Sequence, residues 1–429
     1  MTETERMPTI RERIAVLSVN MFIRPEGIHS GKWFGSGDHK DLRTSLLLRK
    51  IRDFDIVILQ EMFEVGIRQR HFVRAAYDLG FKYHAGSVWP RLTDRFLIDG
   101  GLLILSRYPI VERGQHSFSL GSGSDGVCSK GVLYARVQLS PDLADSLHVF
   151  TTHTQAGDRL KEYSIRAAQL KELQQFVAKT IREDPYAPLL ITGDFNLDAR
   201  HDLRHDPATG DVYSTPCEES QVYQTLYSDL HGVLAAGRTL VDLMKHHDTT
   251  KLSGHIHPIT NGDGHATLYH ESDPLSEEKI GKCIDYMFFS PGVRERRSVS
   301  GDIPTLHLSV IPGKTDVDHG DVAAILLATD ADTNASTRFP ITHLSDHYAL
   351  RGEFELEVTP VNRPDGSPPR PGQRLYEILQ LHFPPKAFTQ RTQHLWQWKV
   401  RIALLAIALS STSLVVVIGQ TLTSALGTS

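Results

Sequence analysis

An acid and an amide follow an apolar run in the segment 189–198, which reads LLITGDFNLD. This pattern predicts a buried strand that carries Asp194 and Asn196 at its carboxyl end. Side chains two positions apart on a strand point to the same face. A carboxylate and an amide directed together into a cleft can hold a metal ion, a nucleophilic water or a phosphate oxygen. The alternative is an Asx-type turn, in which both side chains bond only the local backbone.

Other apolar runs of the chain also end at, or begin just after, a polar residue with catalytic potential. Any one of these residues alone would fit a cap, a turn or a surface position. Their repeated occurrence beside predicted strands favours one common site at the rim of a sheet. In chain order these residues are Asn20, Glu61, His153, Asp194 with Asn196, and Asp346 with His347.

The elements that must position this site are strands mixed with amphipathic helices. Helical periodicity covers 41–52, 65–79 and 159–182, and a strand at 283–289 carries Asp285 early on. A further helix is expected near 221–234, while 296–338 is expected to be an insertion of undefined structure. Mixed elements of this kind predict two sheets packed face to face with helices outside.

Composition is that of a globular enzyme. The chain has 429 residues, of which 40% are hydrophobic and 23% charged, with a formal net charge of -5. No global basic field exists to attract nucleic acid. The cysteines (Cys128, Cys217 and Cys283) form no metal-binding pattern, which indicates a reducing compartment without a disulfide framework.

The two ends of the sequence differ in character. Residues 1–13 are polar and contain no apolar signal segment. Residues 402–426 contain no charged residue, and a helix of about 25 residues can cross a bilayer. Lys399 and Arg401 precede this run, which places the larger part of the chain in the cytosol. A buried core helix is the alternative for the run.

These patterns divide the chain into expected units. We expect a catalytic domain over 1–358, a Pro-rich linker and juxtamembrane segment over 359–398, and a membrane anchor over 399–429.

At this point the motifs resemble a known group, the endonuclease/exonuclease/phosphatase (DNase I-like) superfamily. The resemblance spans about Ile14 to Glu357, and the superfamily fold implies a four-layered α/β sandwich. The motifs that carry it, in order, are Asn20, Gln60-Glu61, Thr152-His153, Gly193-Asp194-Phe195-Asn196, Ile284-Asp285-Tyr286 and Ser345-Asp346-His347.

Within the superfamily the chain is most similar to the neutral sphingomyelinases. The histidine motif 152–156 and the lysine segment 129–134 resemble theirs, and the apolar C-terminal run fits membrane-attached members. Asp125 lies five residues before Lys130, a spacing like that of an Asp–Lys switch in one branch. A turn residue in a Gly/Ser loop is the favoured interpretation of Asp125.

Two departures separate the chain from other branches. Met21 follows Asn20 where apurinic endonucleases carry an acid nearby, and Ile284-Asp285-Tyr286 replaces the Cys-Asp-Arg motif of inositol 5-phosphatases. Some membrane-attached relatives have two membrane spans where this sequence indicates one.

The resemblance implies a role for each motif residue. Glu61 and Asn20 would hold Mg²⁺, with Mn²⁺ as a substitute. His347 would be the general base, oriented by Asp285 and by Asp346, although Asp346 could instead lie nearer the metal. The remaining catalytic residues would position water and substrate or stabilise the transition state: Asp194, Asn196, His153 and Lys130.

The function implied is a phospholipase C-type hydrolysis of sphingomyelin to ceramide and phosphocholine, at a cytosolic membrane surface. An inositol-phosphosphingolipid phospholipase C is the close alternative. A nuclease of the same fold and a non-enzymatic scaffold are the others. The expected partners are a sphingolipid substrate and the bilayer, reached through 402–426, with no nucleic acid.

Overall fold

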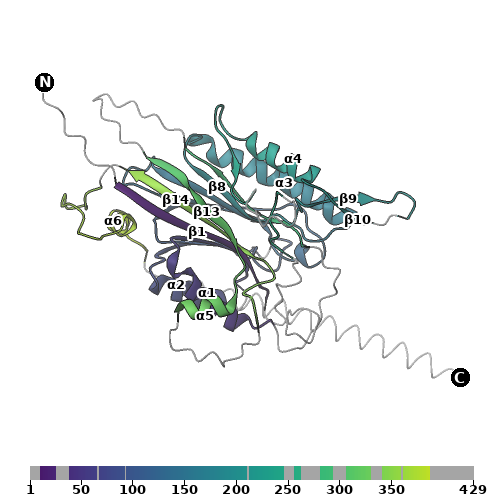
Figure 1. Cartoon of the computed structure of the whole chain (residues 1–429), viewed down its shortest axis with the longest axis horizontal. Helices are drawn as coiled ribbons and strands as arrows, with labels where there is room; N and C mark the ends of the chain where they lie inside the picture. The colour runs from purple at the N-terminus through teal and green to yellow at the C-terminus, as the bar shows by residue number, and fades with distance from the viewer. Residues whose placement is uncertain are drawn as a thin grey trace.

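The computed structural model describes residues 10–25, 38–64, 67–91, 93–209, 212–245, 256–261, 281–292, 306–329, 341–358 and 361–386. Its centre consists of two six-stranded sheets that pack face to face. Helices lie on the outer side of each sheet (Figure 1). The expected α/β sandwich of two mixed sheets flanked by helices is therefore confirmed.

The first sheet combines strands from both ends of the described chain. Its parallel pair is β1–β2, and the other neighbours are antiparallel. In spatial order the strands are β13 (His307–Asp318), β14 (Ala349–Val358), β1 (Ile10–Ile23), β2 (Ile56–Met62), β4 (Leu103–Ser106) and β3 (Tyr83–Gly86).

The second sheet has the same plan, with β7–β8 as its parallel pair. A separate two-stranded sheet is formed by β9 (His201–His205) and β10 (Val212–Pro216). The strands of the second six-stranded sheet are, in spatial order, β11 (Val241–Asp242), β12 (Asp285–Ser290), β8 (Leu189–Asp194), β7 (Ser146–His153), β6 (Gly131–Gln138) and β5 (Ile110–Ser117).

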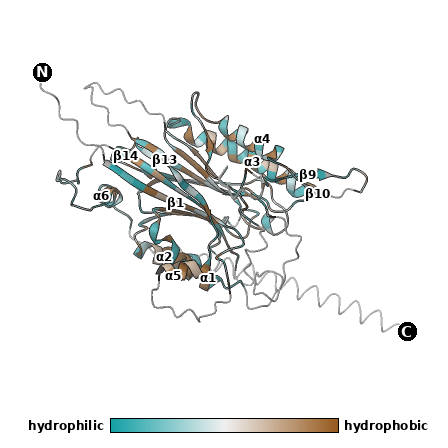
Figure 2. Ribbon diagram, viewed as in Figure 1, coloured by the Kyte–Doolittle hydropathy of each residue, from teal (hydrophilic) through white to brown (hydrophobic). Residues whose placement is uncertain are grey.

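Alternation along the strands builds three apolar clusters. On β1, Ile14 and Val16 face the second sheet, whereas Ala15 and Leu17 face the helices outside. Helices α1 (Lys40–Lys50), α2 (Arg68–Asp78) and α5 (Val322–Thr329) cover the first sheet. Helices α3 (Leu160–Thr180) and α4 (Gln221–His231) cover the second, and apolar and polar residues alternate along both (Figure 2).

Several elements differ from the expectation drawn from the sequence. The interval 296–338 contains a well-formed edge strand, β13, and the helix α5. Strand β13 was obscured because its pairing with β14 is interrupted between Val310 and Thr315, which breaks the period of two. The short strands β3 and β5 were not predicted, since neither carries an apolar run of its own.

Part of the expected linker is folded onto the first sheet. Helix α6 (Leu375–His382) buries Leu375, Ile378 and Leu379 in the cluster between the sheets. Arg374 pairs with Glu12, near the start of β1. Helix α6 therefore docks at the end of the sandwich where β1 begins.

We expect Leu379→Ala to lower the free energy of unfolding by about 2–5 kcal/mol, because it opens a cavity under α6. Urea denaturation of the purified protein measures this change. Leu381→Ala is the matched control: Leu381 lies on the same helix with 46% of its surface exposed. Equal stability of the two variants would mean that α6 does not stabilise the domain.

No helix of the described residues is long and apolar enough to cross a membrane. The predicted anchor at 399–429 lies outside the described residues, as does 387–398 of the predicted juxtamembrane segment.

Candidate active site

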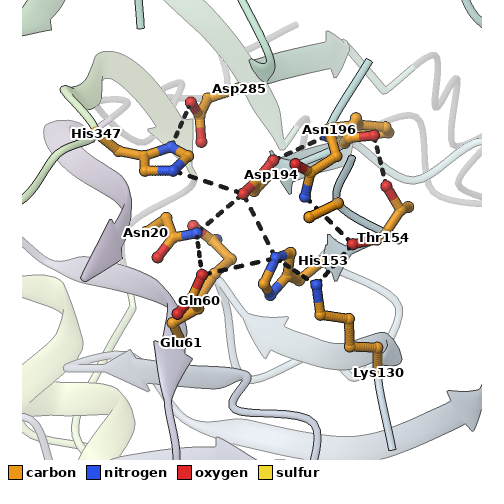
Figure 3. Close-up of polar contacts among 12 residues, drawn as sticks. Asn20, Gln60, Glu61, Lys130, His153, Thr154, Asp194, Asn196, Asp285 and His347 are labelled. Carbon is orange, nitrogen blue, oxygen red and sulfur yellow. Dashed lines mark hydrogen bonds and ion pairs between the residues drawn. The ribbon is translucent and has the colours of Figure 1, made fainter. Parts of the chain in front are cut away.

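One rim of the sandwich collects the polar residues that end the central strands (Figure 3). Parallel pairing aligns Asn20 with Gln60 in the first sheet and His153 with Asp194 in the second. Asp285, the first residue of β12, pairs with Asp194 from the other side. The two parallel pairs face each other, so four carboxyl ends of strands converge at one place.

Asp194 lies at the centre of this cluster. Its Oδ2 accepts a hydrogen bond from Asn20 Nδ2 at 2.9 Å, and its Oδ1 accepts from the backbone N–H of Asn196 at 2.8 Å. Oδ2 also lies 3.5 Å from His153 Nε2 and 3.8 Å from His347 Nε2. Burial, assisted by the nearby charge of Asp285, raises the pKa of Asp194 to about 6.

Asp285 and His347 form a buried carboxylate–imidazole pair. His347 Nδ1 lies 2.9 Å from Asp285 Oδ2, which fixes the proton on Nδ1 and leaves Nε2 free to accept one. Burial alone would lower the pKa of His347, but the carboxylates of Asp285 and Asp194 together raise it well above its usual value. The pair thus presents a strongly basic nitrogen toward Asp194.

Backbone hydrogen bonds hold this pair in place from a region that the sequence left uninterpreted. Thr260 Oγ1 accepts from the backbone N–H groups of Ile284 and Asp285, at 3.0 and 3.1 Å. The Thr260 carbonyl accepts from Tyr348 N at 2.7 Å. No sequence signal indicated Thr260, because its contacts join segments distant along the chain.

Glu61 is a carboxylate held under strain. Its φ of 51° lies in the left-handed region, which costs a non-glycine residue about 1–3 kcal/mol. Asn20 Nδ2 donates to Glu61 Oε1 at 3.1 Å, and no hydrogen bond reaches Oε2 from the described residues. Burial, opposed by the charge of Lys130, raises the pKa of Glu61. The site therefore contains a negative charge that the protein alone compensates poorly.

Among the described residues Asp346 makes no hydrogen bond to the imidazole of His347, and its charge raises the pKa of both Glu61 and His347. Its Oδ1 accepts from Ser345 Oγ at 3.2 Å, and its charge contributes to the raised pKa of Glu61. Ser345 Oγ also donates to the backbone carbonyl of Asn20 at 2.6 Å, so the Ser-Asp-His motif is tied to the end of β1. Of the two acids expected to orient His347, Asp285 makes the contact.

Lys130 and His153 form the cationic side of the site. Lys130 Nζ donates to His153 Nε2 at 2.8 Å and to the Thr154 carbonyl at 2.9 Å. Burial, with the positive charge of Lys130, lowers the pKa of His153 well below its usual value, so the imidazole is neutral here. The same Thr154 carbonyl accepts from Asn196 Nδ2 at 3.2 Å.

Asp125 is more than a turn residue. Its Oδ2 lies 2.8 Å from Lys130 Nζ and also accepts from the backbone N–H of Ala156 at 2.8 Å. The expected turn is present, since Asp125 lies in the 3₁₀ turn Gly123–Gly126, but the pairing with Lys130 goes beyond the favoured interpretation as a turn residue. The sequence signal for this pairing was the spacing of five residues between Asp125 and Lys130.

The Gly-Asp-Phe-Asn turn requires its glycine. Gly193 has a φ of 140°, and a Cβ there would lie 2.2 Å from the Thr152 carbonyl oxygen of the paired strand β7. Only glycine lets the two parallel strands approach so closely at their ends. Asn196 then adopts φ 47°, a left-handed conformation that asparagine tolerates. Asp194 thus bonds the local backbone at Asn196 and also takes part in the polar cluster of the site.

Two neighbouring sets of residues could hold a cation: Asp194 with Asp285 and His347, or Glu61 with Asn20. Ligand atoms of Asp194, Asp285 and His347 lie within 4.8 Å of one another, but a cation between Asp285 and His347 would break their hydrogen bond. Glu61 makes no hydrogen bond to His347 among the described residues. Because few positive groups balance its negative charge, its carboxylate is suited to bind a hard divalent ion. The amide of Asn20 currently turns its nitrogen toward Glu61 and its Oδ1 toward Phe22 N, 3.0 Å away.

Comparison with known proteins gives matches both in sequence and in structure. Residues 19–347 match the Endonuclease/Exonuclease/phosphatase family. A sphingomyelinase of Dictyostelium discoideum is 28% identical over 370 residues, covering 76% of each chain. Sphingomyelinase C of Listeria ivanovii is 33% identical over 172 residues, covering 36% of this chain and 49% of that protein. The crystal structure of SmcL superposes with a TM-score of 0.49 at 20% identity, covering 80% of this chain and 98% of that chain.

Proposed function

The chain belongs to the endonuclease/exonuclease/phosphatase family, and from this premise we propose that it is a Mg²⁺-dependent phospholipase C-type enzyme that hydrolyses sphingomyelin. The products would be ceramide and phosphocholine. The similarity to a sphingomyelinase over 370 residues supports the choice of substrate. The Asp285–His347 pair facing Asp194 carries the choice of reaction, because it supplies a base where a water would attack phosphorus.

His347 acts as the general base in this proposal. A water oxygen attacks phosphorus while Nε2 of His347 takes the water proton, and Asp285 stabilises the imidazolium that forms. The bond between phosphorus and the ceramide oxygen breaks, and that oxygen takes up a proton from solvent, while the imidazolium of His347 later returns its proton to solvent. Asp194, held by Asn20 and Asn196, orients the water beside Nε2.

Lys130 and His153 stabilise the negative charge that develops on the phosphoryl oxygens in the transition state. Lys130 is the donor of this pair, since His153 Nε2 accepts from its Nζ. A bound phosphodiester places negative charge beside the imidazole and therefore favours its protonated form. His153 then becomes a second donor to the phosphoryl oxygens.

Glu61 would hold Mg²⁺ in this proposal, with Asn20 joining through its oxygen if the amide turned over. When bound, the ion polarises the phosphate and stabilises charge in the transition state. Asp346, whose charge already acts on Glu61, would add to the negative potential that attracts the ion. Two carboxylates, Glu61 and Asp346, act on each other in this part of the site, and their combined negative charge supports a requirement for a metal ion.

The proposed function is tested with purified full-length protein in mixed detergent micelles, with Mg²⁺ and then with chelator. We expect Mg²⁺-dependent release of phosphocholine from sphingomyelin, abolished by chelation. An inositol phosphosphingolipid and a DNA duplex are offered in parallel. Release of phosphoinositol alone would reassign the head group, and cleavage of DNA without lipid turnover would overturn the proposal.

A further inference from the structure

Exposed apolar side chains gather on two loops at the active-site end of the sandwich. The loop 87–99 carries Val88 and Leu97, which are 64% and 52% exposed. The loop 118–130 carries Leu120 and Val127, which are 46% and 39% exposed. We call Val88, Leu97, Leu120 and Val127 the loop patch. Single exposed apolar residues are ordinary, but several on adjoining loops mark an interaction surface.

The two loops are tied together by backbone hydrogen bonds. Leu97 N donates to the Val127 carbonyl at 2.9 Å, and Ser129 N donates to the Ile98 carbonyl at 3.0 Å. Arg95 Nη2 donates to the Phe118 carbonyl at 3.3 Å. These bonds hold the loop that carries Leu97 against the loop that carries Val127.

The loop patch adjoins the candidate active site on both sides. Val127 lies three residues before Lys130 on the same loop. The loop 87–99 leads to Gly101, whose carbonyl accepts from Met62 N at 2.8 Å, next to Glu61. Both loops are therefore directly connected to backbone that carries site residues.

The polar residues of these loops suit an interface with phosphate groups. Arg91 and Arg95 are exposed on the loop 87–99, and Trp89 and Phe96 are half-buried there. Arginines can extend toward phosphates while apolar neighbours enter the layer beneath, and tryptophan favours this interface. Asp94 is the exposed acid between them, and its carboxylate accepts from Arg91 N at 2.6 Å.

We infer that the loop patch docks on the surface of a phospholipid bilayer and so holds the active-site mouth against its lipid substrate. This inference rests on the proposed function, because a lipid phosphodiester must reach the site from a membrane plane. Val88 and Leu97 enter the headgroup layer, while Arg91 and Arg95 contact lipid phosphates. The loop patch would thereby give the catalytic domain its own contact with the bilayer, in addition to any contact made by the predicted anchor at 399–429.

The test compares two forms of one substrate with the full-length protein and Mg²⁺. Sphingomyelin is presented in phosphatidylcholine vesicles, and a short-chain sphingomyelin is presented below its micelle concentration. We expect the double variant Val88→Asp/Leu97→Asp to lose at least about 10-fold in turnover on vesicles, because charged side chains resist entry into the headgroup layer. Turnover of the monomeric substrate should stay within about two-fold of wild type, since neither residue contacts the site cluster.

Leu143→Asp is the matched control. Leu143 is 58% exposed in the turn between β6 and β7, at the end of the second sheet opposite the site. It should keep wild-type turnover on both substrates. Undiminished vesicle turnover in the double variant would overturn the inference, and so would an equal loss on both substrates.

A second measurement separates this inference from the proposed function. Hydrogen exchange of the full-length protein is followed with and without phosphatidylcholine vesicles that contain no substrate. Protection should appear in peptides covering 87–99 and 118–130 but not in those covering 139–146. Protection of these peptides without any sphingomyelin turnover would support membrane docking by the loop patch but refute the proposed function. Absence of protection would refute the surface.

Discussion

Replacing His347 with glutamine is expected to reduce kcat/KM for the phosphodiester by about 10²–10⁴-fold, the usual contribution of a positioned general base. Glutamine retains a polar side chain of similar length but cannot accept the proton of the attacking water. The assay is Mg²⁺-dependent phosphocholine release, with circular dichroism to verify folding. His343→Gln, on the same segment but outside the site cluster, should stay close to wild type. A folded His347→Gln protein with nearly full activity would refute the assignment of the base.

The pH profile gives this prediction a second, independent readout. The pKa of His347 is raised by Asp285, so the acid limb of kcat/KM in the wild type reflects loss of the proton from a stabilised imidazolium. Asp285→Asn removes the nearest negative charge and therefore lowers that pKa. The acid limb should shift to lower pH while the maximum rate falls. A profile that is lower but unshifted would show that Asp285 does not act through His347.

Glu61→Gln is expected to lower Mg²⁺-dependent turnover by at least about 10³-fold, because a neutral amide replaces the carboxylate proposed to hold the ion. The Glu61→Gln substitution should also change how much Mg²⁺ raises the free energy of unfolding, which is a measurement independent of activity. In the wild type, Mg²⁺ at about 100 times its dissociation constant should add about 2.7 kcal/mol to the free energy of unfolding. In Glu61→Gln this increment should be nearly absent.

The sign of the metal-free effect follows from the raised pKa of Glu61. A carboxyl group with a higher pKa in the folded state stabilises the fold at low pH, and that contribution is lost as pH rises through the folded pKa. At neutral pH without Mg²⁺, Glu61→Gln should therefore be more stable than the wild type. Thermal unfolding with and without Mg²⁺ measures both effects. Glu64→Gln, three residues further along, is the control that should keep the Mg²⁺ increment.

If Glu61→Gln bound Mg²⁺ with an unchanged stability increment, the ion would have to lie elsewhere. The cluster of Asp194, Asp285 and His347 would then be the alternative ligand set. Because that set includes the proposed base, the same experiment on Asp285→Asn distinguishes the two locations.

The sequence by itself determined the residue types and the strand ends that carry them. Apolar runs with a period of two specify central strands, and the carboxyl ends of parallel neighbours meet at one edge. Asn20, Glu61, His153 and Asp194 could therefore be assigned to one rim without coordinates. The Gly-Asp-Phe-Asn segment was recognised as the end of a strand, whereas the close approach of strand β7 that requires Gly193 is seen only in the structure.

Only the tertiary structure decided which groups touch. A role for Asp285 beside His347 was expected only from the family resemblance; the structure shows the contact, which joins residues 62 positions apart and is supported by Thr260 from a third segment. The pairing of Asp125 with Lys130 likewise depends on how loops pack at the rim. Such contacts depend on side-chain directions and burial that periodicity does not encode.

The outer elements of the domain, β13 and α6, were also recognised only from the tertiary structure. Strand β13 pairs with β14 across an interruption, and α6 fills the end of the sandwich from within a proline-rich segment. Both elements are short or irregular, so their local signal is weak, and they are stabilised by the surface they cover rather than by intrinsic propensity. Local sequence thus specified the central strands and the chemistry at their ends, whereas packing specified the outer elements and the contacts that set each pKa.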